Sequence, residues 1–384
     1  MFGVWSRGLL LPPFERRIVV PQTEILMASV QSTLNQAKQE AFVHKVLGNT
    51  SAAMTTILAA IGDHLGLFKD LAANGPTTST ELAQRTGTNE RYVREWLGGM
   101  ATAGYVEYDP ATSLFTLPTE HAAVLAAEGG PFFFGGIYQM FPAFMSVYNQ
   151  VVEAFQRGGG VRQADYPPAM WDGLERFSAG WFNNLLLQQW IPAMPAVESK
   201  LKSGARVADI GCGRGRALIK LAEAYPTCEY VGYDAYGPAV QEATARAKEA
   251  GVQNRVTFKQ ADVSKGLSGQ FHLITTFDVV HDAIDPLGLL RAIHSALRPD
   301  GVYVCLDVNC SDKLEDNAGP LGAMFHGVSV MYCMTTSLAW GGAGLGTVGF
   351  HQKKVQELCS EAGFREVRRV PLENPFNNLY EIIP

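Results

Sequence analysis

Short apolar runs alternate with helical patterns along the second half of the chain. Apolar stretches of strand length fall at residues 206–210, 230–233, 256–260, 271–277 and 301–306. The apolar spacing over 217–224 is that of a helix, and it directly follows the glycines after the first stretch. Strands that alternate with helices predict a parallel, doubly wound sheet of the Rossmann-like α/β class.

The last two apolar runs break this alternation. Residues 364–372 and 378–383 are both strand-like, and a short segment with Glu373, Asn374 and Pro375 separates them. A short polar connection that contains proline is typical of a hairpin. We therefore expect the sheet to be closed by an antiparallel last strand.

A different pattern occupies residues 41–120. An amphipathic helical pattern over 54–73 precedes two shorter ones, at 80–85 and 90–100, which are joined by a turn. Strand-like residues at 102–108 and 114–117 follow, on either side of a turn that contains proline. Two short helices followed by a two-stranded hairpin predict a winged helix-turn-helix domain.

The expected domain organisation has three further segments: residues 1–40, residues 121–202 and the sheet domain at 203–384. Residues 1–40 are expected to be a disordered extension. Its first part, Met1 to Leu26, precedes a second start at Met27, with an organelle transit peptide as the alternative. Residues 121–202 are expected to be a helical connector with helices for the dimer and the active site. Within it, 129–152 has no charged residue but contains Pro142 and several glycines, so we interpret it as a buried interdomain or dimer helix rather than a membrane span.

A glycine-rich turn follows the first predicted strand. Residues 207–215 read V-A-D-I-G-C-G-R-G, so Asp209 ends an apolar run and the glycines lie between strand and helix. Glycine permits a sharp turn and lets a ligand approach the backbone closely. Arg216 stands where a dinucleotide fingerprint needs its third glycine, and no G-K-[ST] sequence follows for a phosphate loop. The expected cofactor-binding residues of this turn are Asp209, Gly211, Cys212 and Gly213.

Acidic residues follow the next predicted strands. Asp234 comes directly after 230–233, where a carboxylate can hold both ribose hydroxyls of a nucleoside. Asp262 and Val263 come after 256–260, where a carboxylate and a backbone amide can bracket an adenine. The expected cofactor-binding residues at these strand ends are Asp234, Ala235, Asp262, Val263, Phe277 and Asp278.

Together, these motifs resemble those of the class I S-adenosylmethionine-dependent methyltransferases, over residues 203–384. The resemblance implies S-adenosyl-L-methionine as the cofactor and methyl transfer as the activity, with another nucleotide-binding α/β domain as the alternative. The whole arrangement is similar to winged-helix methyltransferases of mycobacterial type and, more distantly, to plant-type small-molecule O-methyltransferases. The matches to the first group include Gly160-Val161, Trp171, Glu175-Arg176-Phe177 and Cys333-Met334.

The plant-type resemblance adds a catalytic hypothesis. Its members place a histidine base in an H-D-x-x-D pattern after the fourth strand, which His281, Asp282 and Asp285 match here, with Ala283 where that group usually has tryptophan. Histidine titrates near neutral pH and can take the proton of a hydroxyl acceptor, while Asp282 or Asp285 orients its ring. The alternative is that His281 only caps the strand or contacts the cofactor. The candidate catalytic residues are therefore His281 and Asp282.

The methyl acceptor is expected to be a small, largely apolar or aromatic molecule that is methylated on oxygen. Residues 317–352 contain no Asp, Glu, Lys or Arg, and small-molecule sites are mostly apolar. A dimer interface would have the same composition, and a cysteine-based acceptor site with Cys305, Cys310 and Cys333 is a further alternative. The side chains expected to roof the acceptor are Met324, Phe325, Met331, Tyr332, Met334, Trp340 and Phe350.

Charge and cysteine content narrow the expected partners and location. The net charge is −6, and residues 75–118 hold three arginines and no lysine against five acidic residues (3 − 5 = −2), whereas DNA-binding domains are basic. We therefore expect no nucleic-acid partner and a winged domain that serves dimerisation and active-site closure in a homodimer; a cofactor-sensing transcriptional regulator is the alternative function. Six cysteines without C-x-x-C pairs or metal-ligand spacing with histidine predict free thiols in a reducing compartment and no metal site. We expect the protein to be cytoplasmic and not attached to a membrane.

Overall fold

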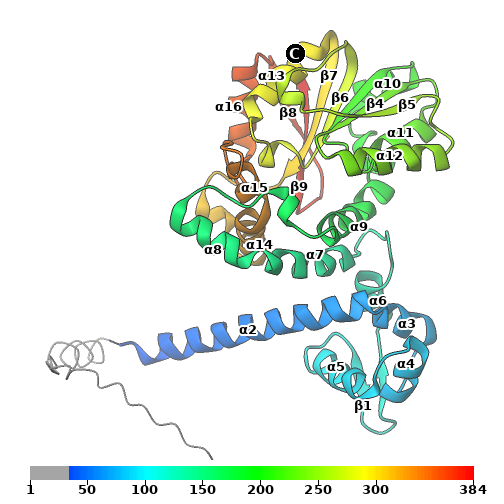
Figure 1. Cartoon of the computed structure of the whole chain (residues 1–384), viewed down its shortest axis with the longest axis vertical. Helices are drawn as coiled ribbons and strands as arrows, with labels where there is room; N and C mark the ends of the chain where they lie inside the picture. Colours follow the sequence, from blue (N-terminus) through cyan, green and yellow to red (C-terminus); the bar gives the residue numbers. More distant parts are fainter. Residues whose placement is uncertain (1–33) are drawn as a thin grey trace, which may run out of the picture. The chain divides into compact units, whose positions relative to one another are not determined.

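The computed structural model describes residues 34–384 of the protein (Figure 1). The chain divides into two units, Met1–Met54 and Thr55–Pro384. The first helix, α2 (Gln36–His64), begins inside the expected disordered extension, so that expectation is wrong for residues 36–40. The rest of the expected extension falls mainly on residues 1–33, which lie outside the described residues.

A seven-stranded sheet forms the C-terminal half of the second unit and confirms the predicted α/β fold. The strand order is β5-β4-β3-β6-β7-β9-β8. The first five strands of this order are parallel, and β9 is antiparallel to both of its neighbours, as the hairpin pattern predicted. The strands are β3 (Arg206–Ile210), β4 (Glu229–Asp234), β5 (Val256–Gln260), β6 (Phe271–Phe277), β7 (Leu297–Val308), β8 (Glu366–Val370) and β9 (Asn377–Ile383).

Helices cover both faces of this sheet and build one buried apolar cluster on each (Figure 1). Because side chains of a strand alternate between faces, Val207 packs with Leu218 in one cluster and Ala208 packs with Leu290 in the other. The helices on the first face are α10 (Pro195–Lys202), α11 (Arg216–Ala224) and α12 (Gly237–Glu249). Those on the second face are α13 (Pro286–Ala296) and α16 (Gln352–Ala362).

The winged domain packs its helices around Trp96. This side chain is buried, its ring centre lies 5.1 Å from that of Phe68, and its Nε1 donates a hydrogen bond to the Leu58 carbonyl at 2.8 Å. The contact ties the last turns of α2 to the three helices that follow. The elements are α3 (Leu67–Asn74), α4 (Ser79–Thr86), α5 (Glu90–Thr102), β1 (Glu107–Asp109) and β2 (Leu114–Thr116).

Two details of the winged domain differ from the sequence prediction. The helix expected over 54–73 is two helices, because Gly66 adopts a left-handed conformation (φ 71°) between α2 and α3. The wing strand expected from residue 102 begins only at Glu107, because α5 continues to Thr102. Helical hydrogen bonds therefore extend into a segment whose composition suits a strand.

The connector is a set of helices rather than one long helix. The uncharged segment 129–152 contains all of α7 and the first half of α8. Helix α7 packs closely on α9, because a Cβ on Gly136 would lie 2.3 Å from the Gly173 carbonyl oxygen. Only glycine at this position permits the two helices to approach so closely. The connector helices are α6 (Thr119–Leu125), α7 (Gly135–Ser146), α8 (Tyr148–Arg157) and α9 (Ala169–Asn184), followed by the π-helical turn η2 (Leu186–Trp190).

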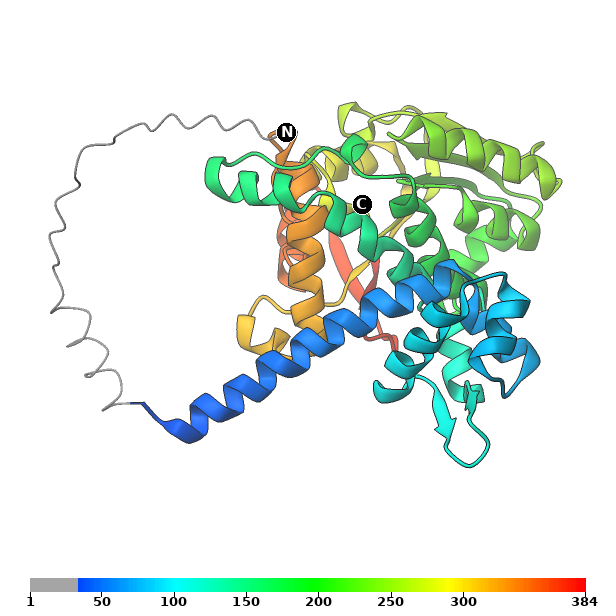
Figure 2. The same cartoon turned by 60° about the horizontal axis from the view of Figure 1, so that its bottom comes forward.

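The insertion between β7 and α16 packs against this connector. Tyr332 and Cys333 share one buried cluster with Met140 and Met170, and Figure 2 shows the two segments side by side in green and orange. The insertion therefore joins the connector in covering one edge of the sheet domain. Its elements are α14 (Pro320–Val328), the π-helical η6 (Ser329–Cys333) and α15 (Met334–Leu338).

Taken singly, no helix among residues 34–384 has the length and apolar character needed to cross a bilayer. The pair α2 and α3 meets those two criteria only when counted together, across a bend of 69°.

The first helix of the winged motif begins with a capping box, which gives a testable contribution to stability. Thr78 Oγ1 accepts a hydrogen bond from the Glu81 amide at 3.3 Å, and Glu81 Oε2 accepts one from the Thr78 amide at 2.9 Å. Thr78→Ala is expected to lower the free energy of unfolding by about 1 kcal/mol, because a helix N–H loses its partner. Urea unfolding measures this, with the exposed neighbour Thr80→Ala as the control. Equal stability of the two variants would show that the box contributes nothing.

Candidate active site

One cavity of about 790 Å³ lies at the carboxyl ends of β3, β4, β5 and β6. Every cofactor-binding and catalytic candidate from the sequence lines it, from the glycine turn through the acidic strand ends to His281 and Asp282. Ligand sites of doubly wound sheets occur at this edge. The residues that the structure brings together here are Asp209, Gly211, Cys212, Gly213, Asp234, Ala235, Asp262, Val263, Phe277, Asp278, His281 and Asp282.

The glycine turn has a backbone that only glycine accommodates at its first position. Gly211 has φ 68°, and a Cβ there would lie 2.5 Å from a methyl group of Val279. The Gly211 and Cys212 amides both donate to the Tyr233 carbonyl, at 2.8 and 3.0 Å, which holds the turn against β4. Burial raises the pKa of the Cys212 thiol, so this side chain is a neutral part of the wall.

Asp234 is fixed in the cavity by backbone donors. Its Oδ2 accepts from the Gly213 amide and its Oδ1 from the Tyr236 amide, both at 2.8 Å. Burial raises the pKa of Asp234, although these two amide bonds act in the opposite direction. Each carboxylate oxygen can accept more than one hydrogen bond, so Asp234 keeps acceptor capacity for two vicinal hydroxyls.

Asp262 and Asp209 have different surroundings from Asp234. Asp262 begins the short helix η3 (Val263–Lys265) and accepts from the Ser264 hydroxyl at 2.6 Å, which lowers its pKa. Asp209 is 2% exposed and accepts from the Thr275 hydroxyl at 2.6 Å. Burial raises the pKa of Asp209 to about 7. We therefore interpret this side chain as a structural support of the glycine turn rather than as a negative charge that binds the ligand.

His281 forms a buried pair with Asp307. The ring Nδ1 donates to Asp307 Oδ1 at 2.7 Å, and the two side chains are 5% and 0% exposed. Asp307 is itself fixed, because it accepts from the amides of Val280 and Val308 at 3.2 and 2.8 Å. Burial lowers the pKa of His281, but Asp307 and Cys333 beside the ring raise it, and the net pKa lies well above its usual value.

The carboxylate that orients His281 differs from the sequence expectation. Asp285 instead caps α13, where its Oδ1 accepts from the Gly288 amide at 2.8 Å, and Asp282 makes no described hydrogen bond to the ring. Sequence reasoning missed Asp307 because it ended the strand at residue 306, whereas β7 continues to Val308. The signal was present, since Asp307 is an acidic residue at a strand end, as Asp234 and Asp278 are.

Asp278 adds a further carboxylate beside this pair. It has φ 56°, and its Oδ1 accepts from Asn377 Nδ2 at 2.6 Å. Burial and the nearby Asp307 raise the pKa of Asp278 to about 7, and burial raises that of Asp282 to about 6. Ligand atoms of Asp278, His281 and Asp307 lie within 4.8 Å of one another, so these three could hold a cation that the sequence pattern did not predict.

The rest of the cavity is a largely aromatic chamber. Of the predicted roof, Met331, Met334 and Phe350 do not line it. The sequence prediction assigned active-site helices to the connector but named none of the side chains that line the cavity, because these reach it only through tertiary packing. The roof residues that do line it are Met324, Phe325, Tyr332 and Trp340, and the principal additions are Met140, Phe144, Phe177, Trp181, Phe182 and Phe376.

The three cysteines considered as an alternative acceptor site have separate surroundings. Cys305 is fully buried within the sheet cluster. Cys333 lines the cavity beside His281, while Cys310 lines a second cavity. The structure therefore does not group them around one ligand.

Ion pairs hold helix α9 against the glycine turn. Arg214 Nη2 lies 2.5 Å from Asp172 Oδ1, and Arg216 and Arg246 each lie 2.5 Å from Glu175 Oε1. The ring of Trp171 stacks on that of Tyr236 with centres 5.0 Å apart. Residues of the connector thus close the cavity over the turn that follows β3.

A nucleoside cofactor fits the residues present. The backbone at Gly211 leaves no room for a side chain, and Asp234 is positioned with spare acceptor capacity. Asn377 Oδ1 and Thr347 Oγ1, both buried and both lining the cavity, have no partner among the described residues. Buried polar atoms without partners are costly, so they favour a bound ligand that supplies them.

The sheet, the glycine turn and the strand-end carboxylate define the methyltransferase class of α/β domain. Residues 201–363 match the family model "Methyltransferase domain", and residues 53–127 match "Rv2258c-like winged HTH domain". These matches confirm the resemblance found in the sequence. The methyltransferase family and similar solved structures with S-adenosylmethionine or S-adenosylhomocysteine bound support S-adenosylmethionine as the cofactor.

Curated and solved proteins agree with this assignment. An O-methyltransferase of ubiquinone biosynthesis from Ruegeria pomeroyi is 32% identical over 111 residues, which are 29% of this chain and 44% of that protein. The mitomycin biosynthesis 6-O-methyltransferase of Streptomyces lavendulae is 22% identical over 62% of this chain and 70% of its own. The fold is similar to the structure of the mitomycin 7-O-methyltransferase MmcR, with a TM-score of 0.70, 19% identity and coverage of 91% and 99%.

Proposed function

We propose that this protein is an S-adenosylmethionine-dependent methyltransferase that methylates a hydroxyl oxygen of a small, largely apolar or aromatic acceptor. The observation that carries the proposal is the buried His281–Asp307 pair, which lines one cavity together with the glycine turn, Asp234 and an aromatic chamber. A base of this kind serves an acceptor that must lose a proton, which favours oxygen. The names of the similar proteins, which are O-methyltransferases, agree.

The residues of the site suit a displacement at carbon. When bound, the cofactor supplies a methyl group activated by its positively charged sulfur. In its neutral form, with its Nδ1–H donated to Asp307, His281 has a lone pair at Nε2 that can accept the hydroxyl proton. Asp307 stabilises the imidazolium that results. Phe177, Trp181 and the other aromatic side chains align the acceptor and exclude water.

Two buried atoms indicate the polarity of the acceptor. Thr347 Oγ1 and Asn377 Oδ1 line the chamber without a described partner. An acceptor with a second hydroxyl or carbonyl group would pair with Thr347, whereas a pure hydrocarbon ring would leave it unsatisfied. We therefore infer an oxygenated aromatic or alicyclic acceptor.

The choice of methylated atom can be tested with matched acceptors. Labelled S-adenosylmethionine is offered with a panel of hydroxylated aromatic rings, each paired with its amine and thiol analogues of the same shape. Transfer to the hydroxyl member is expected to exceed transfer to its analogues by at least roughly tenfold, because the base acts on the O–H. Preference for the amine or thiol member would contradict oxygen as the acceptor atom.

The winged domain is proposed to make no functional contact with DNA. Its arginines are already paired within the domain: Arg91 with Glu95, Arg94 with Glu90 and Arg85 with Asp70, each at 2.5 Å. Paired arginines on a net acidic segment offer little charge to phosphates.

A DNA titration tests this part of the proposal. The full chain and a fluorescent duplex at about 0.15 M salt are expected to give a Kd weaker than about 10⁻⁴ M, the weak end of non-specific binding. Tighter binding that is lost in the double variant Arg91→Ala, Arg94→Ala would favour the transcriptional regulator instead.

A homodimer in the cytoplasm is proposed as the setting of this activity. Phe42, Val43 and Leu47 of α2 are 65%, 58% and 64% exposed, and apolar side chains on one helix favour a protein partner. All six cysteines are free thiols, which agrees with a reducing compartment. Sedimentation equilibrium is expected to give twice the chain mass for the wild type and a lower mass for Phe42→Asp, Leu47→Asp. A monomeric wild type would contradict the dimer.

A further inference from the structure

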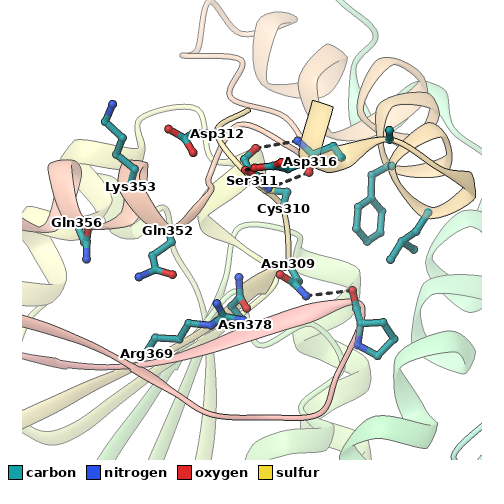
Figure 3. A pocket seen from close by; sticks show the side chains of 16 residues that line it. Asn309, Cys310, Ser311, Asp312, Asp316, Gln352, Lys353, Gln356, Arg369 and Asn378 are labelled. Atoms are coloured by element: carbon teal, nitrogen blue, oxygen red, sulfur yellow. Dashed lines mark hydrogen bonds between the residues drawn. The ribbon is translucent and has the colours of Figure 1, made fainter. Parts of the chain in front are cut away.

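A second cavity, of about 840 Å³, lies beyond β7 and outside the methyltransferase chamber (Figure 3). It is bounded by residues 309–312 after β7, the first turns of α14 and α16, and the outer strands β8 and β9. Among the described residues, only Phe325 lines both cavities. The second cavity is therefore a separate space that shares one wall with the first.

The two sides of this second cavity differ in chemistry. Five carboxamide side chains line it, those of Asn309, Asn317, Gln352, Gln356 and Asn378. Figure 3 labels all but Asn317 and shows them on the loop, α16 and the β8–β9 side. A carboxamide both donates and accepts hydrogen bonds. Leu321, Phe325 and Pro375 form an apolar surface elsewhere in the lining.

The polar wall has a fixed backbone. The Ser311 amide donates to Asn317 Oδ1 at 2.9 Å, and Asn317 Nδ2 donates back to the Ser311 carbonyl at 2.8 Å. The Asn309 amide donates to the Phe376 carbonyl at 2.8 Å, which ties the loop to the residue before β9. These bonds preorganise the side of the cavity from which the polar groups project.

One polar atom in this wall has no partner. Asn378 is 3% exposed, and its Oδ1 makes no hydrogen bond within residues 34–384. The residue lines the second cavity, and Figure 3 shows its side chain there beside Arg369. A buried acceptor of this kind requires an O–H or N–H donor to offset its desolvation.

The charges in the lining balance. The side chains of Lys353 and Arg369 make no hydrogen bond or ion pair with any residue in the described range, and Asp312 and Asp316 carry the opposite charges. Two cations and two carboxylates give no net preference for an anionic or a cationic ligand. All four groups can still form strong hydrogen bonds with neutral hydroxyls, since the cations donate and the carboxylates accept.

We propose that this second cavity binds a neutral polyhydroxylated molecule, of the sugar or polyol class, as a ligand distinct from the methyl acceptor. Each hydroxyl of such a molecule donates and accepts, which matches paired carboxamides and supplies the donor that Asn378 Oδ1 lacks. The C–H face of a sugar ring packs against the apolar surface around Phe325. Because Phe325 also lines the chamber, the occupied site lies next to the wall of the active site.

Ligand-observed NMR on the full chain tests the proposal. The neutral probes are methyl β-D-glucopyranoside and myo-inositol, and the charged comparators are D-gluconate and D-glucosamine. Saturable binding of at least one neutral probe is expected, stronger than that of both comparators and unaffected by S-adenosylhomocysteine. Absence of saturable binding by both neutral probes, stronger binding of a comparator, or displacement by S-adenosylhomocysteine would overturn it.

Variants locate the binding in the cavity. Asn378→Leu keeps the side-chain size and is expected to weaken the binding of the neutral probe by about tenfold or more. Gln356→Ala alters an exposed side chain that the fold does not need and is expected to weaken it by roughly two- to tenfold. Gln189→Ala, exposed and outside both cavities, is the matched control and should bind as the wild type. Unchanged binding in both cavity variants would overturn the assignment.

Discussion

His281→Ala is expected to lower kcat for a hydroxyl acceptor by about 10²- to 10⁴-fold, the usual contribution of a general base. The Kd for S-adenosylhomocysteine should stay nearly unchanged, because the glycine turn and Asp234 keep their contacts with each other. Steady-state kinetics measures the first quantity and calorimetry the second. Retention of most activity would leave alignment and water exclusion as the mechanism.

The pH profile separates a base from a residue that only positions the acceptor. His281 acts when neutral, so kcat should rise with pH through its pKa, which Asp307 and Cys333 raise well above the usual value despite burial. Asp307→Asn removes a negative charge and should shift this rise to lower pH while reducing the maximum rate. Asp285→Asn is the control, because Asp285 caps α13 and should not move the profile. A profile shared by wild type and Asp307→Asn would contradict the pairing.

Asp234→Ala is expected to weaken S-adenosylhomocysteine binding by about 1.5 to 3 kcal/mol, roughly 10- to 150-fold. The variant removes the carboxylate proposed for the ribose hydroxyls and leaves the Gly213 amide without its acceptor at 2.8 Å. Isothermal calorimetry measures the change. Asp300→Ala, an exposed acidic residue outside both cavities, is the control and should bind as the wild type. Unchanged affinity in Asp234→Ala would remove Asp234 from the cofactor site.

Local sequence pattern is enough to predict the strand-end part of the site. Parallel strands place their carboxyl ends at one edge, so an acid or glycine that follows each apolar run reaches the same cavity. The pattern alone groups Gly211, Asp234, Asp262 and Asp278, and all four line one cavity. It also predicts the antiparallel β9, because two strand-like runs with a short link leave no room for a crossover helix.

The parts that could not be predicted depend on contacts between distant segments. Asp307 pairs with His281 across 26 residues, and a strand end set two residues too early concealed it. Glu175 meets Arg216 and Arg246 only because α9 folds over the glycine turn. Phe177 and Trp181 enter the chamber from the same helix. Such contacts leave no periodic signal in the sequence of either partner.

Transfer of a labelled methyl group tests the central claim most directly. The full chain is incubated with methyl-labelled S-adenosylmethionine and hydroxylated aromatic acceptors, and the product is analysed by NMR. The account predicts that label appears as a methyl ether on oxygen, with one S-adenosylhomocysteine formed per methyl transferred, and that His281→Ala loses nearly all of this transfer. Label on nitrogen, sulfur or carbon, or no transfer to any acceptor by a protein that binds the cofactor, would contradict it.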